Sequence, residues 1–275
     1  MSLPELSVDS APRGDSNGPM TSALPPTILK ARDGPPAEVL NPGGEASVCL
    51  VCEHASSNIP DSLSELGLAS KDRLSHAAWD IGAADVAVAL ADALGAPLVV
   101  SRVSRLVYDC NRAPCAADAI PEKVENIEVP GNRELSDTDR NGRVVEVYTP
   151  FRDLLARTLR GFAAPPALIT IHSFTPTWLG KSRHVEIGLL HDADDRLARR
   201  MMAAAPTGVD TRFNEPYSAD DGVTHTLKAH AVPHGRQNVM IEIRNDLITD
   251  PVGVARIAEH IADMLAPALA REAAT

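Results

Sequence analysis

The sequence predicts an α/β fold of three layers, with helices on both faces of a mostly parallel or mixed central sheet. Strand-like and helix-like segments alternate from residue 46 onward, which is typical of strands joined by crossover helices. The 275 residues, 44% of them hydrophobic, are enough for one large domain with a sizeable core. We therefore predict a single domain at 28–275, after a disordered Pro-, Gly- and Ser-rich segment at 1–27.

The individual elements follow from hydrophobic periodicity and from the Gly and Pro residues between segments. Short apolar runs predict strands at 47–52, 97–101, 103–108, 167–171, 185–190 and 239–243. Longer amphipathic segments predict helices at 70–94, with a break near 79–82, and at 147–162, 194–205 and 251–269. The polar segments 115–143 and 206–237 are predicted to be irregular, and either could act as a lid.

Composition excludes several classes of function. The net charge of −11 and the aromatic content of 3% argue against binding to nucleic acid or to an anionic membrane surface. We find no apolar run long enough to span a bilayer and no signal-peptide pattern, so we expect a cytoplasmic protein. The cysteines, including the pair Cys49 and Cys52 in a predicted strand, are expected to be reduced thiols and not metal ligands. The oligomeric state is left open.

Two histidines lie at the ends of separate predicted strands. His54 follows the strand 47–52, and His172 follows the strand 167–171. In parallel α/β folds the carboxyl ends of the strands meet at one edge of the sheet, where ligands bind. Neutral imidazole is the commonest zinc ligand, so we predict that both histidines bind Zn²⁺ or another divalent metal, together with a third protein ligand.

The third ligand is an acid, for which the sequence offers two candidates. Asp80 is our choice, because an acid within an otherwise apolar segment needs a partner. The alternative for Asp80 is a helix cap. Glu53 adjoins His54, but neighbouring strand residues face opposite sides of a sheet, so both could ligate only beyond the end of the strand.

Glu242 lies inside the apolar run 239–243. A buried carboxylate is costly unless it is paired or functional, and burial raises its pKa toward the range that suits a general base. We therefore predict a catalytic role for Glu242. The alternative is a salt bridge to Arg244, two residues further along the same strand face.

A carboxylate-bearing substrate is predicted from the end of the run 105–112. There, Asn111 and Arg112 form an amide–guanidinium pair, which can grip a carboxylate. Arg183 and Arg244 are expected to line the same pocket and to add positive charge. A weaker alternative is a metal-free hydrolase with Cys110 or Ser173 as nucleophile, although Gly-x-Ser-x-Gly is missing around Ser173.

Together these segments resemble the N-formylglutamate amidohydrolase family, as a divergent branch. The resemblance rests on five short motifs in order: Cys52-Glu53-His54-Ala55-Ser56, Trp79-Asp80-Ile81-Gly82-Ala83, Ser104-Arg105-Leu106-Val107-Tyr108-Asp109-Cys110-Asn111-Arg112, Ile171-His172-Ser173-Phe174 and Ile241-Glu242-Ile243-Arg244-Asn245. It implies a fold like that of the zinc carboxypeptidases and aspartoacylases, a phosphorylase/hydrolase-like architecture. That group takes two ligands from a His-x-x-Glu motif; here position 57 is Ser, hence Asp80.

The resemblance implies hydrolysis of the amide of a small anionic N-acyl amino acid, such as N-formylglutamate. It places substrate binding on Asn111 and Arg112 and water activation on Glu242. Two alternatives stay open: the same fold and metal acting on another peptide-like amide, and a binding protein that keeps the pocket without catalysis.

Overall fold

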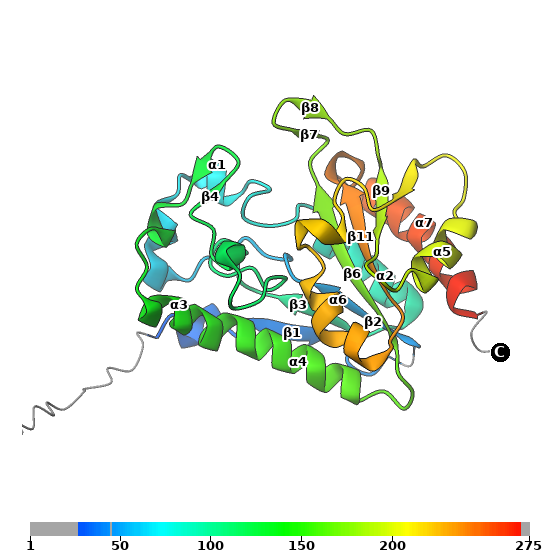
Figure 1. Ribbon diagram of the computed structural model, residues 1–275, viewed down its shortest axis with the longest axis horizontal. Coiled ribbons are helices and arrows are strands. Elements are labelled where there is room, and N and C mark those ends of the chain that lie inside the picture. The colour runs from blue at the N-terminus through cyan, green and yellow to red at the C-terminus, as the bar shows by residue number, and fades with distance from the viewer. Residues whose placement is uncertain (1–26, 45, 271–275) are drawn as a thin grey trace, which may run out of the picture.

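The computed structural model describes residues 27–44 and 46–270, so the predicted disordered segment 1–27 lies outside the described residues except for Thr27. A mixed seven-stranded sheet forms the centre, in the order β1-β3-β2-β6-β11-β9-β10 (Figure 1). In chain order the strands are β1 (Ala37–Leu40), β2 (Val48–Cys52), β3 (Leu98–Ser101), β6 (Ala167–Phe174), β9 (Ile187–Leu190), β10 (Thr211–Phe213) and β11 (Asn238–Arg244).

The central part of the sheet is parallel. Strands β3, β2, β6 and β11 run in the same direction, whereas β1 and β9 lie antiparallel to their neighbours β3 and β11. The carboxyl ends of β2, β6 and β11 therefore come to the same edge. In the register of β6 and β11, His172 pairs with Glu242, so the two side chains emerge next to each other on one face.

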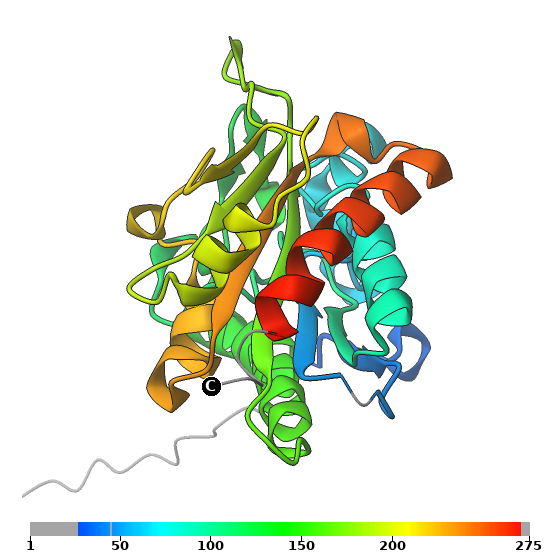
Figure 2. The same cartoon turned by 90° about the vertical axis from the view of Figure 1, so that its right-hand side faces the viewer.

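Helices cover both faces of the sheet, which confirms the predicted three-layer αβα arrangement. The core on one face is formed with α2 (Ala83–Leu94), α5 (Arg196–Ala203) and α7 (Pro251–Ala270), and α2 and α7 lie side by side in Figure 2. The core on the other face is formed with α4 (Thr149–Arg160) and α6 (His225–His230).

Alternation along β6 and β11 decides which side chains reach each layer. Ile171 and Ile241 pack into the α2–α5–α7 layer, and Met240 packs into the α4–α6 layer. Because successive strand residues point to opposite faces, His172 and Glu242 are directed to the α4–α6 side. The period of two along the strands thus places both polar side chains outside the larger apolar core.

The predicted strand 103–108 is wrong. This segment is a buried turn, in which the backbone N–H groups of Val107 and Tyr108 donate to Ser104 O at 2.9 and 3.4 Å. The Ser104 hydroxyl in turn donates to Ala78 O at 2.8 Å. Local bonding to a serine competes with sheet formation, and a buried apolar turn has the same composition as a buried strand.

The predicted helices differ from the observed ones mainly in their bounds. The segment 70–94 is helical only in α1 (Ser70–Arg73) and α2, so the predicted break is wider than expected. The helix predicted at 147–162 begins earlier, through α3 (Asp137–Arg143) and a π-helical stretch at Val144–Tyr148 that leads into α4. Ser136 caps α3 by accepting from Asp139 N, a start signal within the segment predicted to be irregular.

The remaining elements are short. Two hairpins lie outside the central sheet, β4 (Lys123–Val124) with β5 (Ile127–Glu128), and β7 (Thr177–Trp178) with β8 (Lys181–Ser182). Short 3₁₀ segments lie at Ala31–Asp33, Asp61–Gly67, Ala117–Ala119, Pro130–Asn132, Ala219–Asp221, Val232–His234 and Asn245–Leu247. Among the described helices, none has the length and apolarity that crossing a membrane would require.

Candidate active site

A cavity of about 350 Å³ opens at the carboxyl edge of β2, β6 and β11. Its lining comes from four stretches of the chain that are far apart in sequence: 54–80, 105–125, 172–178 and 217–242. This is the edge at which parallel α/β folds bind ligands. The cavity therefore lies where the polar strand ends predicted it.

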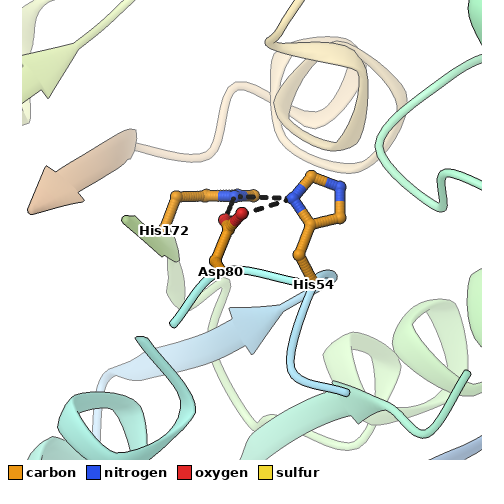
Figure 3. A group of neighbouring side chains, drawn as sticks. All are labelled: His54, Asp80 and His172. Carbon is orange, nitrogen blue, oxygen red and sulfur yellow. Dashed lines mark hydrogen bonds and ion pairs between the residues drawn. The ribbon is translucent and has the colours of Figure 1, made fainter. Parts of the chain in front are cut away.

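A buried cluster of His54, Asp80 and His172 lies at this cavity (Figure 3). The Nδ1 atoms of the two histidines are 3.2 Å apart, and Asp80 Oδ2 lies 3.2 Å from His54 Nδ1 and 2.9 Å from His172 Nδ1. Three potential ligand atoms thus form a small triangle. With Zn–N and Zn–O distances near 2.0–2.1 Å, the ligands of a tetrahedral zinc ion stand about 3.3 Å from one another. The triangle has nearly this size, so the donor set and its spacing could hold a metal ion.

Asp80 is held in place by the chain around it. Its backbone N–H donates to His54 O at 3.0 Å, which ties the loop before α2 to the end of β2. Gly82 follows with φ +78°, and a Cβ there would lie 2.7 Å from Ile248 O. Only glycine suits both the left-handed backbone and the close approach. Asp80 does not cap α2, whose N-cap is Gly82, so the helix-cap alternative is wrong.

Carboxylates lie at the outer ring nitrogens of both histidines. Asp109 Oδ1 is 2.7 Å from His54 Nε2, and Glu53 Oε2 is 3.1 Å from His172 Nε2. Metal-ligating histidines commonly have a carboxylate there, because it fixes the ring and raises its basicity. Of the two acids considered as third ligand, Asp80 thus forms one corner of the triangle. Glu53 lies on the far side of His172.

Arg105 joins two of the acids, and neither it nor Asp109 was assigned a role from the sequence. Its Nη1 donates to Asp80 Oδ1 at 3.1 Å, and its Nη2 donates to Asp109 Oδ2 at 3.2 Å. Together with the contacts of His54 to both acids, these bonds close a ring of four side chains. Arg105 and Asp109 are four residues apart in the run 105–112, and this spacing is the sequence signal that could have indicated the pair.

The charges at the cluster favour a divalent cation. Three buried carboxylates, on Glu53, Asp80 and Asp109, face the single guanidinium of Arg105, which leaves two negative charges to be compensated. Burial lowers the pKa of His172, but the charge of Glu53 and contacts with Asp80 outweigh it and hold the pKa well above its usual value. The buried carboxylates therefore favour positive charge at the histidines, which a divalent cation would supply.

Glu242 lies beside the cluster and lines the same cavity. Its Oε2 is buried and has no hydrogen-bond partner among the described residues. Burial raises the pKa of Glu242 to about 7. The alternative partner, Arg244, instead contacts Asp246 and Glu186, so the predicted salt-bridge alternative does not form. An unpaired carboxyl group with a pKa near neutrality suits proton transfer.

Asn111 and Arg112 both line the cavity, in different states. Asn111 Oδ1 accepts from Thr226 N at 3.0 Å, and its Nδ2 donates to Val223 O at 2.5 Å, so its amide holds the segment that begins α6. Arg112 Nε donates to Asp118, an exposed carboxylate that also lines the cavity, at 2.7 Å. Arg112 is therefore placed to meet a carboxylate in the cavity, whereas Asn111 has a positioning role that the sequence did not indicate.

Arg183 and Arg244 are placed differently from the prediction. Neither is among the described residues that line the cavity. Arg183 lies behind aromatic side chains of the cavity wall, and Arg244 donates to His184 O at 2.8 Å. Their long side chains find nearer acceptors and rings than any ligand in the cavity would offer.

The two alternative nucleophiles are engaged or inaccessible. Ser173 borders the cavity, but its Oγ donates to Ile81 O at 2.8 Å. Cys110 is buried, and burial raises the pKa of its thiol far above neutrality. A thiolate is the reactive form of cysteine, so this environment disfavours nucleophilic attack by Cys110.

The outer carboxylate Asp109 gives a first testable prediction. Asp109→Asn should weaken zinc binding by about 10- to 100-fold, because the His54 ring loses the charged acceptor that orients it. Competition with a chromophoric chelator measures this affinity. Asp153→Asn, a half-exposed acid on α4, is the matched control and should bind zinc as the unmodified chain does. Equal affinity in the two variants would contradict the role given to Asp109.

Comparisons with known proteins point to one family. The family model described as N-formylglutamate amidohydrolase matches residues 46–249. A gene product of Agrobacterium tumefaciens has a similar structure, with 44% sequence identity, a TM-score of 0.87, and coverage of 90% of this chain and 99% of that one. An N-formylglutamate amidohydrolase from Ralstonia eutropha shares the fold at 18% identity and a TM-score of 0.54, over 87% of this chain and 99% of that one. None of the curated proteins matches. The chain belongs to the N-formylglutamate amidohydrolase family.

Proposed function

We propose that this protein is a metal-dependent amidohydrolase that cleaves the amide of an N-formyl or other N-acyl amino acid, giving a carboxylic acid and a free amino acid. The triangle of His54, Asp80 and His172 carries the proposal, because its size and excess negative charge suit a divalent cation such as Zn²⁺. Family membership supports the reaction type.

We assign a residue to each step of the reaction. A bound divalent cation would supply Lewis-acid chemistry, lowering the pKa of a water and polarising the amide carbonyl. Glu242, unpaired and beside His172, accepts a proton from the attacking water and later delivers it to the leaving nitrogen. Arg112 binds the substrate carboxylate and so fixes the amide near Glu242.

Elemental analysis with a substrate panel tests this proposal. We expect about one zinc or other divalent ion per chain, as a three-ligand catalytic site requires, and hydrolysis of at least one N-acyl amino acid, followed by release of primary amine. A protein that takes up no metal would contradict the assigned cluster. A metal-loaded protein that binds these amides without cleaving them would favour the binding-protein alternative.

Substrate binding by Arg112 is tested through KM. Arg112→Ala should raise KM by about 10- to 100-fold and leave kcat nearly unchanged, since it removes a charge-assisted contact of about 1.5–3 kcal/mol that substrate and transition state share. Asp118→Asn is the companion variant. It removes the carboxylate that occupies Arg112 in this structure and should lower KM. An unchanged KM in Arg112→Ala would mean that another group binds the carboxylate.

A further inference from the structure

Three aromatic side chains form one side of the active-site cavity: Phe174, Trp178 and Tyr217, here called the aromatic wall. Only 3% of the chain is aromatic, yet these residues converge from the end of β6, from the hairpin β7–β8 and from the segment after β10. Such a concentration at a polar cavity needs an explanation beyond general burial.

Arg183 contacts all three rings of the aromatic wall from outside the cavity lining. Its Cζ lies 5.6, 4.9 and 4.8 Å from the ring centroids of Phe174, Trp178 and Tyr217, and its Nη1 donates to the Tyr217 hydroxyl at 3.0 Å. Since Arg183 is outside the cavity lining while all three rings are within it, the guanidinium braces the rings without competing for a ligand. The wall is therefore formed before any ligand arrives.

The aromatic wall begins next to the reacting centre. Phe174 follows His172 by two residues on β6, so both side chains lie on the same face of the sheet, one strand repeat of about 6.6 Å apart. Tyr217 and Glu242 line the same cavity, and burial, followed by the charge of that carboxylate, raises the pKa of Tyr217 to about 12. A substituent on an amide bound at the cluster would therefore be within reach of these rings.

The segment 109–125 gives the cavity a lining of different chemistry. There the cations Arg112 and Lys123 line the cavity together with Asp118 and Glu125. Under the proposed function the amino-acid carboxylate binds Arg112, and the scissile amide lies at the His54–Asp80–His172 cluster. On this placement the acyl group extends from the amide away from the carboxylate, and the aromatic wall, which begins beside His172, is the apolar surface that we assign to it.

We propose that the aromatic wall is an acyl subsite, and that the preferred substrates are N-acyl amino acids whose acyl group is apolar or aromatic and larger than formyl. The inference rests on the proposed function. Three rings offer far more apolar surface than a one-carbon formyl group can cover. Each further methylene that the wall buries should improve binding about fourfold, until the wall is covered.

A series of N-acyl-L-glutamates tests the subsite, because only the acyl group changes: formyl, acetyl, butanoyl, hexanoyl and benzoyl. We expect kcat/KM of the zinc-loaded protein to rise along the aliphatic series by about fourfold per methylene, with hexanoyl and benzoyl more than about tenfold above formyl. The dissociation constants of the same compounds, measured calorimetrically on metal-free protein, should tighten in the same order.

Variants at the hairpin β7–β8 assign the preference to the wall. Trp178→Ala should lower the hexanoyl-to-formyl ratio of kcat/KM at least about tenfold, and Trp178→Phe should restore most of the preference for benzoyl. Leu179→Ala is the matched control, because Leu179 is the next residue and is 63% exposed. Its ratio should equal that of the unmodified protein.

The remaining outcomes also decide whether the aromatic wall is an acyl subsite. A formyl compound that is bound and cleaved as well as the longer ones, or a ratio unaffected by Trp178→Ala, would overturn the subsite while leaving the proposed function intact. A preference for N-formyl-L-phenylalanine over N-hexanoyl-L-glutamate would assign the wall to the amino-acid side chain and overturn the acyl assignment. If no compound is cleaved, the proposed function fails, and the dissociation constants still decide: a tightening series supports the wall, and a flat series overturns it.

Discussion

Glu242→Gln should lower kcat by about 10²- to 10⁴-fold while changing KM only slightly, the effect expected when a general base is removed. The amide is nearly the same size as the carboxyl group, so the buried site keeps its packing but cannot accept a proton. Single-turnover kinetics together with metal analysis provide the measurement, and the metal content should be unchanged. Glu259→Gln, at an exposed position of α7, is the matched control. Full kcat in Glu242→Gln would disprove the assigned role.

The pH profile gives an independent check on Glu242. Its pKa is raised to about 7 by burial, and a bound cation would lower it from that value. The base acts in its ionised form, so kcat/KM should fall as the pH decreases below a midpoint at or under about 7. The residual activity of Glu242→Gln should lack this acid limb. An identical limb in both proteins would assign the ionisation to another group.

Loss of the metal is the second large effect that we expect. His54→Ala and His172→Ala should each reduce the bound metal from about one ion per chain to nearly none and abolish measurable turnover, because each removes one of three protein ligands. His234→Ala, an exposed histidine, is the control and should retain the metal. Retention of a full complement of metal in both ligand variants would place the metal elsewhere.

Zinc should also stabilise the folded chain. At a free concentration about 100-fold above Kd, the gain of about 2.7 kcal/mol corresponds to a rise in Tm of roughly 5–10 °C for a protein of this size. In His172→Ala this rise should disappear. Thermal melts of metal-free and zinc-loaded protein measure it, and equal rises in the two proteins would contradict the ligand assignment.

The gain in Tm should depend on pH in a defined direction. Without metal the pKa values of His54 and His172 are raised, so their contribution to stability is full below the unfolded value near 6.5 and is lost as the pH rises through the folded values. Zinc must displace those protons. Its stabilising effect should therefore be larger at pH 8 than at pH 6, and a gain that shrinks over that range would contradict the mechanism.

Much of the cluster could be predicted because strand ends are marked in the sequence. His54 and His172 each follow an apolar run, and Glu242 interrupts one, so position along a strand predicted where all three would emerge. Asp80 is indicated because an acid in an apolar segment needs a partner and because position 57 is Ser, and the structure places it in the triangle with both histidines.

The arginines show where sequence reasoning fails. The apolar run around Arg105 predicts a strand, but its backbone lies in a turn, and its side chain bridges Asp80 and Asp109. Arg183 and Arg244 were expected in the cavity, but both are bound outside its lining. A guanidinium on a long flexible stem reaches acceptors in many directions, so neither spacing nor strand position determines its partner.

By itself, the sequence determined the layered αβα architecture, the edge of the sheet where chemistry would gather, and the family. It could do so because periodicity and strand ends are local properties of the chain. Only the tertiary structure decided that Asp80 lies in the triangle while Glu53 lies behind His172, that Arg105 joins two acids, and that an aromatic wall faces the cavity. Those arrangements depend on contacts between residues tens of positions apart, whose distances are fixed by packing of the sheet and its loops and not by the order of residues along any one segment.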